Sequence, residues 1–121
     1  MQIYVQALGF ELTPALRTHT ERRLQFALGR FNAQVSRLWV RLSDVNGPRG
    51  GDDKRCHVRI TLTDAPEVVI EDTEADLYVA IARAADRAGR TVARRLARSR
   101  DQRHGPGPPP AIDRASDAPS I

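Results

Sequence analysis

The sequence lacks the features that mark disulfide-bonded and membrane proteins. It has a single cysteine, Cys56, in 121 residues, so no internal disulfide can form and a reducing compartment is indicated. No apolar run approaches the roughly 20 residues of a membrane span. The N-terminus, MQIYVQALGF, has neither the charged start nor the long apolar stretch of a signal peptide. We therefore expect a soluble cytoplasmic protein with no membrane partner.

Catalytic and cofactor motifs are also missing. There is no phosphate-binding loop of the G-x-x-x-x-G-K type and no dinucleotide-binding fingerprint. The three histidines share no metal-ligand spacing with Cys56, and the acids at positions 44–53 do not follow an EF-hand pattern, so a salt-bridged loop is expected there. We expect no enzyme activity, no catalytic residues, no cofactor, no metal site and no small-molecule substrate.

Acidic residues are scarce in one long stretch, residues 74–100. This stretch holds seven Arg and three acids, a local excess of four positive charges that equals the net charge of the whole chain, +4. Asp86 is the only acid between Arg83 and Arg100. Such a concentration of positive charge indicates an anionic partner.

The same stretch has the pattern of a long helix with two different faces. It contains no proline and only one glycine, Gly89. Apolar residues at steps of three and four form one stripe, which we predict to be buried. These residues are Tyr78, Ile81, Ala85, Ala88, Val92 and Leu96. On the roughly opposite side lies a stripe that we call the arginine face. It consists of Arg83, Arg87, Arg90, Arg94 and Arg98.

The arginine face has two interpretations: a solvated surface, or a surface that binds phosphates. Like charges three or four positions apart repel each other by about 0.2–0.5 kcal/mol per pair, so a helix that needed only solubility would alternate Glu with Arg. We expect almost nothing to neutralise these guanidinium groups, and their planar fork matches phosphate oxygens. We favour the phosphate-binding interpretation.

Shorter elements precede this helix. Strands are predicted at 2–8, 35–43, 54–63 and 67–73, and a helix begins at Thr13-Pro14 and ends near Arg30. Alternation in the second and third strands points Leu38, Val40, Leu42, Cys56, Val58, Ile60 and Leu62 inward. The opposite sides carry Arg37, Trp39, Arg41, Arg55, His57 and Arg59. The order β-α-β-β-β-α predicts an α+β fold, a four-stranded mixed sheet with both helices on one face and the other face open.

The open side of the predicted sheet offers further RNA contacts, namely Arg37, Trp39, Arg41 and Arg59. Trp39 lies between two arginines, and an exposed aromatic ring flanked by positive charge can stack on nucleobases. Alternatively, another segment covers it. Both interpretations stay open.

The composition changes after Arg100. Residues 102–121 are rich in Pro, Gly and small polar residues and have too little apolar content to offset the entropy of ordering. We predict a single domain at 1–101 and a disordered tail at 102–121.

Two motifs resemble a known family. These are ELTPALR at residues 11–17 and DLYVAI at residues 76–81, the second followed by basic residues. With the predicted element order, residues 1–100 are similar to the ribosome-associated inhibitor and hibernation-promoting factor family. The resemblance implies a fold similar to double-stranded-RNA-binding domains. It also implies docking in the channel of the small ribosomal subunit that messenger and transfer RNA use. Ribosomal RNA contacts would come from Arg87, Arg90 and Arg94, and from Arg22 and Arg23 of the first helix.

The chain departs from this family in two ways. The loop between the second and third strands is longer than in the shortest members, and its DDKRC sequence resembles a sub-branch of the family. The chain also stops without the second domain by which long members dimerise, so we expect a monomer off the ribosome. The leading hypothesis is a ribosome-binding translation inhibitor, or hibernation factor, that occupies the RNA-lined channel. The alternative is a general structured-RNA-binding module, and a protein-interaction domain that regulates transcription is a third class.

Overall fold

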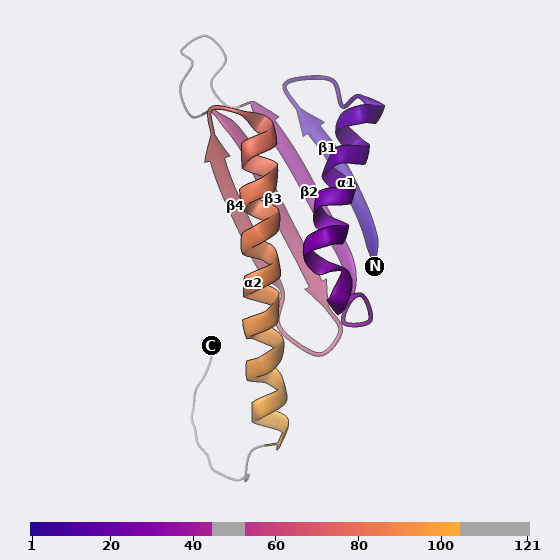
Figure 1. Ribbon diagram of the computed structural model, residues 1–121, viewed down its shortest axis with the longest axis vertical. Helices are drawn as coiled ribbons and strands as arrows, with labels where there is room; N and C mark the ends of the chain where they lie inside the picture. Colours follow the sequence, from indigo (N-terminus) through magenta and orange to yellow (C-terminus); the bar gives the residue numbers. More distant parts are fainter. Residues whose placement is uncertain (45–52, 105–121) are drawn as a thin grey trace.

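The structure, a computed structural model, describes residues 1–44 and 53–104. Its elements follow the predicted β-α-β-β-β-α order (Figure 1). They are β1 (Gln2–Leu8), α1 (Pro14–Leu28), the 3-10 turn η1 (Gly29–Phe31), β2 (Val35–Asp44), β3 (Lys54–Leu62), β4 (Val68–Glu74) and α2 (Leu77–His104).

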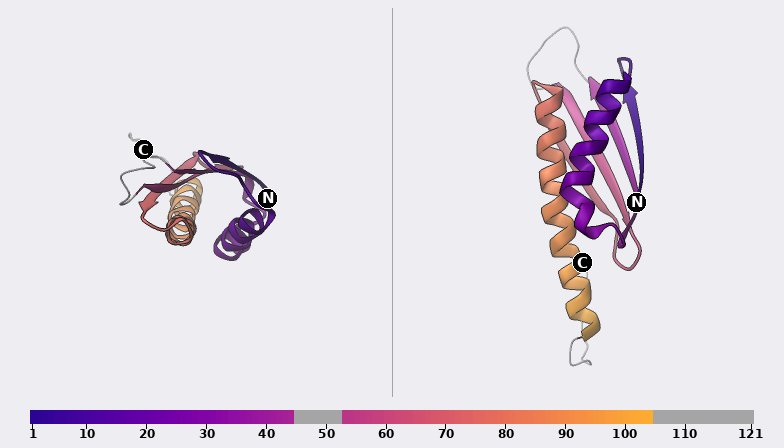
Figure 2. Two further views of the ribbon diagram at one scale, coloured as in Figure 1. Left: turned by 90° about the horizontal axis from the view of Figure 1, so that it is seen from above. Right: turned by 45° about the vertical axis from the view of Figure 1, so that its right-hand side comes forward.

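The four strands form one mixed sheet in the order β1-β2-β3-β4. β1 and β2 are parallel and are joined through α1, whereas β2–β3 and β3–β4 are antiparallel. Both helices cover the same face of the sheet (Figure 2). No described element covers the other face, which we call the open face. The predicted fold class is therefore confirmed.

The strand register places the predicted inner residues in the core. Leu38, Val40, Leu42, Val58 and Ile60 are at most 2% exposed. A register shift of one residue would have moved all of them to the open face. The arginines of β2 therefore point away from the helices, as the alternation predicted.

The first helix begins as its sequence indicates. The Thr13 side chain accepts a hydrogen bond from the Leu16 backbone N–H at 3.2 Å, and Pro14 occupies the first turn. A threonine cap satisfies one of the N–H groups that a helix start leaves unpaired, and proline at this position costs nothing.

The buried stripe of α2 differs from the predicted one at its ends. Ile81, Ala85, Ala88 and Val92 are buried as predicted, but Leu96 is only half-buried and Tyr78 is 50% exposed, so the predicted burial of Tyr78 was wrong. The Tyr78 ring instead lies edge-on to His19 of α1, with 4.7 Å between ring centroids. Two residues outside the predicted stripe, Ala80 and Ala84, are fully buried in its place. The side of α2 that packs on the sheet is therefore lined with small residues, which leaves the large Tyr78 at the edge of the core.

Gly89 lies where the two helices approach each other closely. A Cβ atom there would lie 2.9 Å from the backbone oxygen of Ala27 in α1. Glycine inside a helix costs about 1 kcal/mol relative to alanine. The close contact between the helices leaves no room for a side chain, which explains why a glycine occurs in a stretch otherwise made of good helix formers.

The end of α2 lies beyond the predicted domain boundary. The helix continues past residue 101 to His104, while the predicted tail after residue 104 lies outside the described residues. Neither described helix combines the length and the apolar character that crossing a membrane requires.

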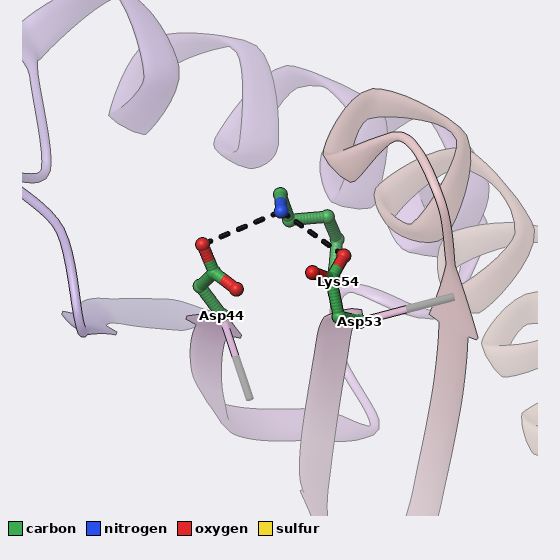
Figure 3. A network of polar contacts seen from close by, with 3 residues as sticks. All are labelled: Asp44, Asp53 and Lys54. Atoms are coloured by element: carbon green, nitrogen blue, oxygen red, sulfur yellow. Dashed lines mark hydrogen bonds and ion pairs between the residues drawn. The ribbon is translucent and has the colours of Figure 1, made fainter. Parts of the chain in front are cut away.

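Lys54 and two aspartates join the ends of β2 and β3 (Figure 3). The Lys54 ammonium lies 3.0 Å from an Asp53 carboxylate oxygen and 3.3 Å from an Asp44 oxygen. Asp53 is 3% exposed. The pKa of Lys54 is raised above its ordinary value, and the largest cause is the hydrogen bond that its ammonium donates to Asp53. The expected salt bridges are confirmed at the base of this loop, whose residues 45–52 lie outside the described residues. Asp53 and Lys54 of the DDKRC sequence thus hold two strand ends together.

Cys56 is part of the core. Its side chain is 1% exposed, and burial, with a smaller effect of the Asp72 charge, raises the pKa of the thiol to about 12. Because the thiolate is the nucleophilic form, this cysteine is a structural residue.

Candidate nucleic-acid interface

The arginine face lies along the outer side of α2. All five of its side chains are exposed, as the spacing predicted. The helix follows the sheet along its length and extends past the sheet at its C-terminal end (Figures 1 and 2). The first two arginines lie in the part of α2 beside β4, and the last three lie nearer its C-terminal end.

Acids of β4 neutralise the first two arginines. Arg83 lies 3.5 Å from Glu74, and Arg87 lies 3.6 Å from Asp72 and donates a 2.8 Å hydrogen bond to the Glu71 backbone oxygen. The expectation that almost nothing neutralises the arginine face was wrong for these two residues. Their partners come from a neighbouring strand, so the helix sequence alone gave no sign of them.

The other three arginines have no acidic partner among the described residues. Arg90, Arg94 and Arg98 take part in none of the ion pairs there, and the one contact of Arg94 is a 3.4 Å hydrogen bond to the Thr91 hydroxyl. They recur at a spacing of four residues, so their side chains project from one side of the helix. This half of the arginine face can bind phosphates without first releasing a carboxylate.

Two neighbouring side chains have a structural task that the sequence did not reveal. Arg95 donates hydrogen bonds to the backbone oxygens of Pro66 and Glu67 at 3.1 and 3.0 Å, and the Ser99 hydroxyl donates one to the Asp64 oxygen at 3.0 Å. These bonds attach the later part of α2 to the turn between β3 and β4.

The two predicted RNA-binding arginines of α1 differ in their surroundings. Arg22 is exposed, while the half-buried Arg23 lies 3.6 Å from Asp86 of α2. Asp86 is the only acid between Arg83 and Arg100, and this contact shows that it joins the two helices. Arg22 is available to a ligand, and Arg23 is largely occupied within the protein.

A shallow hollow between the helices adds a residue that we had not selected. It is lined by Phe26, Ala27, Arg30, Asp86, Gly89 and Arg90. Arg30 is exposed and its guanidinium lies 4.8 Å from the centre of the Phe31 ring. The sequence places Arg30 on the same side of the predicted first helix as Arg22 and Arg23, although we did not predict it as an RNA contact.

The open face carries the remaining predicted residues, Arg37, Trp39, Arg41 and Arg59. All are exposed, and no described element covers Trp39. The Trp39 ring stacks on Tyr4 of β1 with 4.5 Å between centroids and an interplanar angle of 19°. Sequence reasoning missed Tyr4 because only the parallel register of β1 and β2 makes it the partner of Trp39. The predicted residues therefore form two groups on opposite sides of the domain.

The described residues include no group of three or more His, Cys, Asp or Glu side chains that could hold a metal ion.

Comparisons with known proteins identify the family. The family model described as "Sigma 54 modulation protein / S30EA ribosomal protein" matches residues 3–100. A search of curated proteins finds no match. Among solved structures, the N-terminal domain of Protein Y from Thermus thermophilus is 29% identical; the match covers 77% of this chain and 93% of that one, with a TM-score of 0.61. A ribosomal subunit interface protein from Coxiella burnetii is 17% identical over 80% of this chain and 99% of that one, with a TM-score of 0.65, which supports the fold alone. The family match covers most of the chain, which therefore belongs to the Sigma 54 modulation protein / S30EA ribosomal protein family.

Proposed function

We propose that this protein is a ribosome-binding hibernation factor that inhibits translation without catalysing a reaction. Membership of the S30EA family and similarity to a Protein Y domain support a ribosomal partner. A ribosomal partner in turn implies a cytoplasmic protein. The specific partner proposed is the RNA of the small subunit.

The mechanism is occupancy of an RNA-lined site. Arg90, Arg94 and Arg98 bind phosphates of ribosomal RNA, and Arg22 of α1 and Arg30 of η1 supply further positive charge. The rigid domain then fills the channel that messenger and transfer RNA would use and excludes both. Because the attraction comes from phosphate neutralisation, binding is fast and weakens as salt rises.

One observation carries this proposal: three consecutive members of the arginine face have no acidic partner among the described residues. Repulsion between them is tolerated in the free protein, and a ligand rich in phosphate relieves it. A helix surface that served only solubility would gain from interleaved acids, as Arg83 and Arg87 gain from β4.

Sedimentation tests the proposal directly. Purified small and large subunits are mixed separately with the protein and centrifuged through sucrose gradients at low and high salt. We expect the protein to travel with the small subunit at low salt and to dissociate at high salt, and we expect it to reduce translation in a cell-free system. An RNA duplex of similar charge serves as the competitor. If the duplex competes as well as subunits do, the protein is a general structured-RNA-binding module.

A further inference from the structure

A row of flat and apolar side chains crosses the open face at its centre. The strand register pairs Tyr4 with Trp39, Trp39 with Arg59, and Arg59 with Val69, so one residue from each strand stands in this row. Tyr4, Trp39 and Val69 are 42%, 38% and 53% exposed, although they are large and hydrophobic. The Arg59 guanidinium lies 6.0 Å from the centre of the Trp39 ring. Arg59 stands on β3 and Tyr4 on β1, so the two flank Trp39 from opposite sides. We call these four residues the aromatic row.

Positive charge flanks the aromatic row along β2. Arg37 and Arg41 stand on β2 two residues to either side of Trp39, roughly 6–7 Å away along the strand, and neither has an ion pair among the described residues. The acids of this face lie toward β4, where Glu67 is 3.9 Å from Arg59 and Glu71 is 3.1 Å from the His57 ring. The side of the row formed by β1 and β2 is therefore basic, and its hollow is lined by Tyr4, Val5, Gln6, Trp39, Val40, Arg41, His57 and Arg59.

We propose that the open face is a second RNA-binding surface, which takes unpaired nucleotides. A base stacks on the outer face of the Tyr4 ring, whose inner face lies on Trp39, and Arg37 and Arg41 bind the flanking phosphates. Four-stranded RNA-binding sheets use aromatic side chains in this way to stack two or three bases. A duplex hides the faces of its bases inside the stack, so the aromatic row selects single-stranded RNA.

The charges favour RNA over a protein partner. An apolar protein surface would leave Arg37 and Arg41 buried and unpaired, which is costly, whereas a phosphate backbone supplies their counter-charges and bases supply partners for the rings. This inference shares with the proposed function only the class of ligand. The arginine face binds phosphates on one side of the domain, and the aromatic row binds bases on the other.

Trp39 is the only tryptophan of the chain, so its fluorescence reports on the open face alone. The full chain is titrated with a single-stranded oligoadenylate of about ten nucleotides, and separately with a duplex of the same length. We expect the single strand to quench the Trp39 emission and the duplex to have little effect. Tyr4→Ala should weaken single-strand binding about 5- to 150-fold, the range for loss of stacking on one ring, while Tyr4→Phe should retain it.

Matched variants separate stacking from charge. Arg37→Gln combined with Arg41→Gln should flatten the slope of log affinity against log salt for the single strand by about 1.4 units, since each contact contributes about 0.7. Two controls on the helix layer remove an exposed aromatic or basic side chain: Phe26→Ala and Arg17→Gln. Neither should change the quenching, and thermal melting checks that each variant is folded.

Several outcomes would overturn the proposal. Absence of quenching by the single strand is one, and an equal loss in the Phe26→Ala control is another. If the Trp39 emission of the free protein resists quenching by acrylamide, the open face is already covered by residues 105–121 or by a second copy. Quenching by the single strand without binding to small subunits would contradict only the proposed function. Subunit binding without single-strand quenching would contradict only this inference.

Discussion

The sharpest test of the arginine face replaces with glutamine the three members that have no acidic partner among the described residues. Arg90→Gln, Arg94→Gln and Arg98→Gln together remove three positive charges while keeping hydrogen-bonding side chains of similar length. Each phosphate contact contributes about 0.7–0.9 to the slope of log affinity against log salt. The triple variant should therefore show a slope flatter by about two to nearly three units. Three such contacts also account for a roughly 20- to 40-fold loss of affinity between 50 and 200 mM salt, which the variant should no longer show.

A paired variant supplies the control. Arg83→Gln with Arg87→Gln removes charges that Glu74 and Asp72 already neutralise in the free protein. We expect its salt slope to change by less than one unit, because these arginines release few counterions on binding. Its stability should fall, since the half-buried Asp72 loses its charged partner.

The measurement is equilibrium binding of fluorescently labelled protein to purified small subunits across a salt series, with melting curves of each variant. The triple variant should melt at the same temperature as the parent or slightly higher. It relieves two repulsive pairs four residues apart, Arg90 with Arg94 and Arg94 with Arg98, which together amount to about 0.4–1 kcal/mol. An unchanged salt slope in a folded triple variant would show that the arginine face is only a solvated surface, and the reasoning would be wrong.

Three further changes test the framework that carries these surfaces. Gly89→Ala should lower the free energy of unfolding by about 1–2 kcal/mol in chemical denaturation, because overpacking against the Ala27 oxygen outweighs the gain in helix propensity; a stabilised variant would contradict this. Cys56 should resist a thiol reagent at pH 8 in the native protein and react fully in guanidinium, because burial raises the pKa of its thiol to about 12; rapid native labelling would show an open core. The hydrogen bond that Lys54 donates to Asp53 raises the pKa of Lys54 above 10.5, so the stabilisation by this bond is complete below about pH 10.5 and is lost as pH rises through the folded pKa. The difference in melting temperature between the parent and Lys54→Met should therefore shrink above that pH, and a constant difference would refute the ion-pair account.

The fold followed from the sequence because its signals are local. Alternating residues such as Leu38, Val40 and Leu42 fix which face of a strand is buried, and Thr13 followed by Pro14 fixes where a helix begins. These patterns need no knowledge of distant contacts. Tyr78 escaped them because its exposure depends on how closely the alanines of α2 let the helix approach the sheet.

The candidate sites were less predictable because their contacts join distant parts of the chain. Periodicity identified all five members of the arginine face as exposed. It could not show that acids of β4 neutralise Arg83 and Arg87, or that Tyr4 stacks on Trp39 from a strand more than thirty residues away in the chain. Both facts depend on the order and register of the strands, which alternation within one strand does not specify.

The later part of α2 raises the question of what holds a strongly basic helix in place beyond the core. Full burial ends at Val92, and Leu96 is only half-buried. Beyond that point the hydrogen bonds of Arg95 and Ser99 to the turn between β3 and β4 fix the helix to the sheet. A binding surface that is already ordered loses less conformational entropy when its ligand arrives. Arg94 and Arg95 therefore contribute differently to one surface, although they are adjacent and chemically identical. Arg95 orders the helix through backbone oxygens, and this leaves Arg94 projecting from an ordered helix, with its charge unpaired among the described residues.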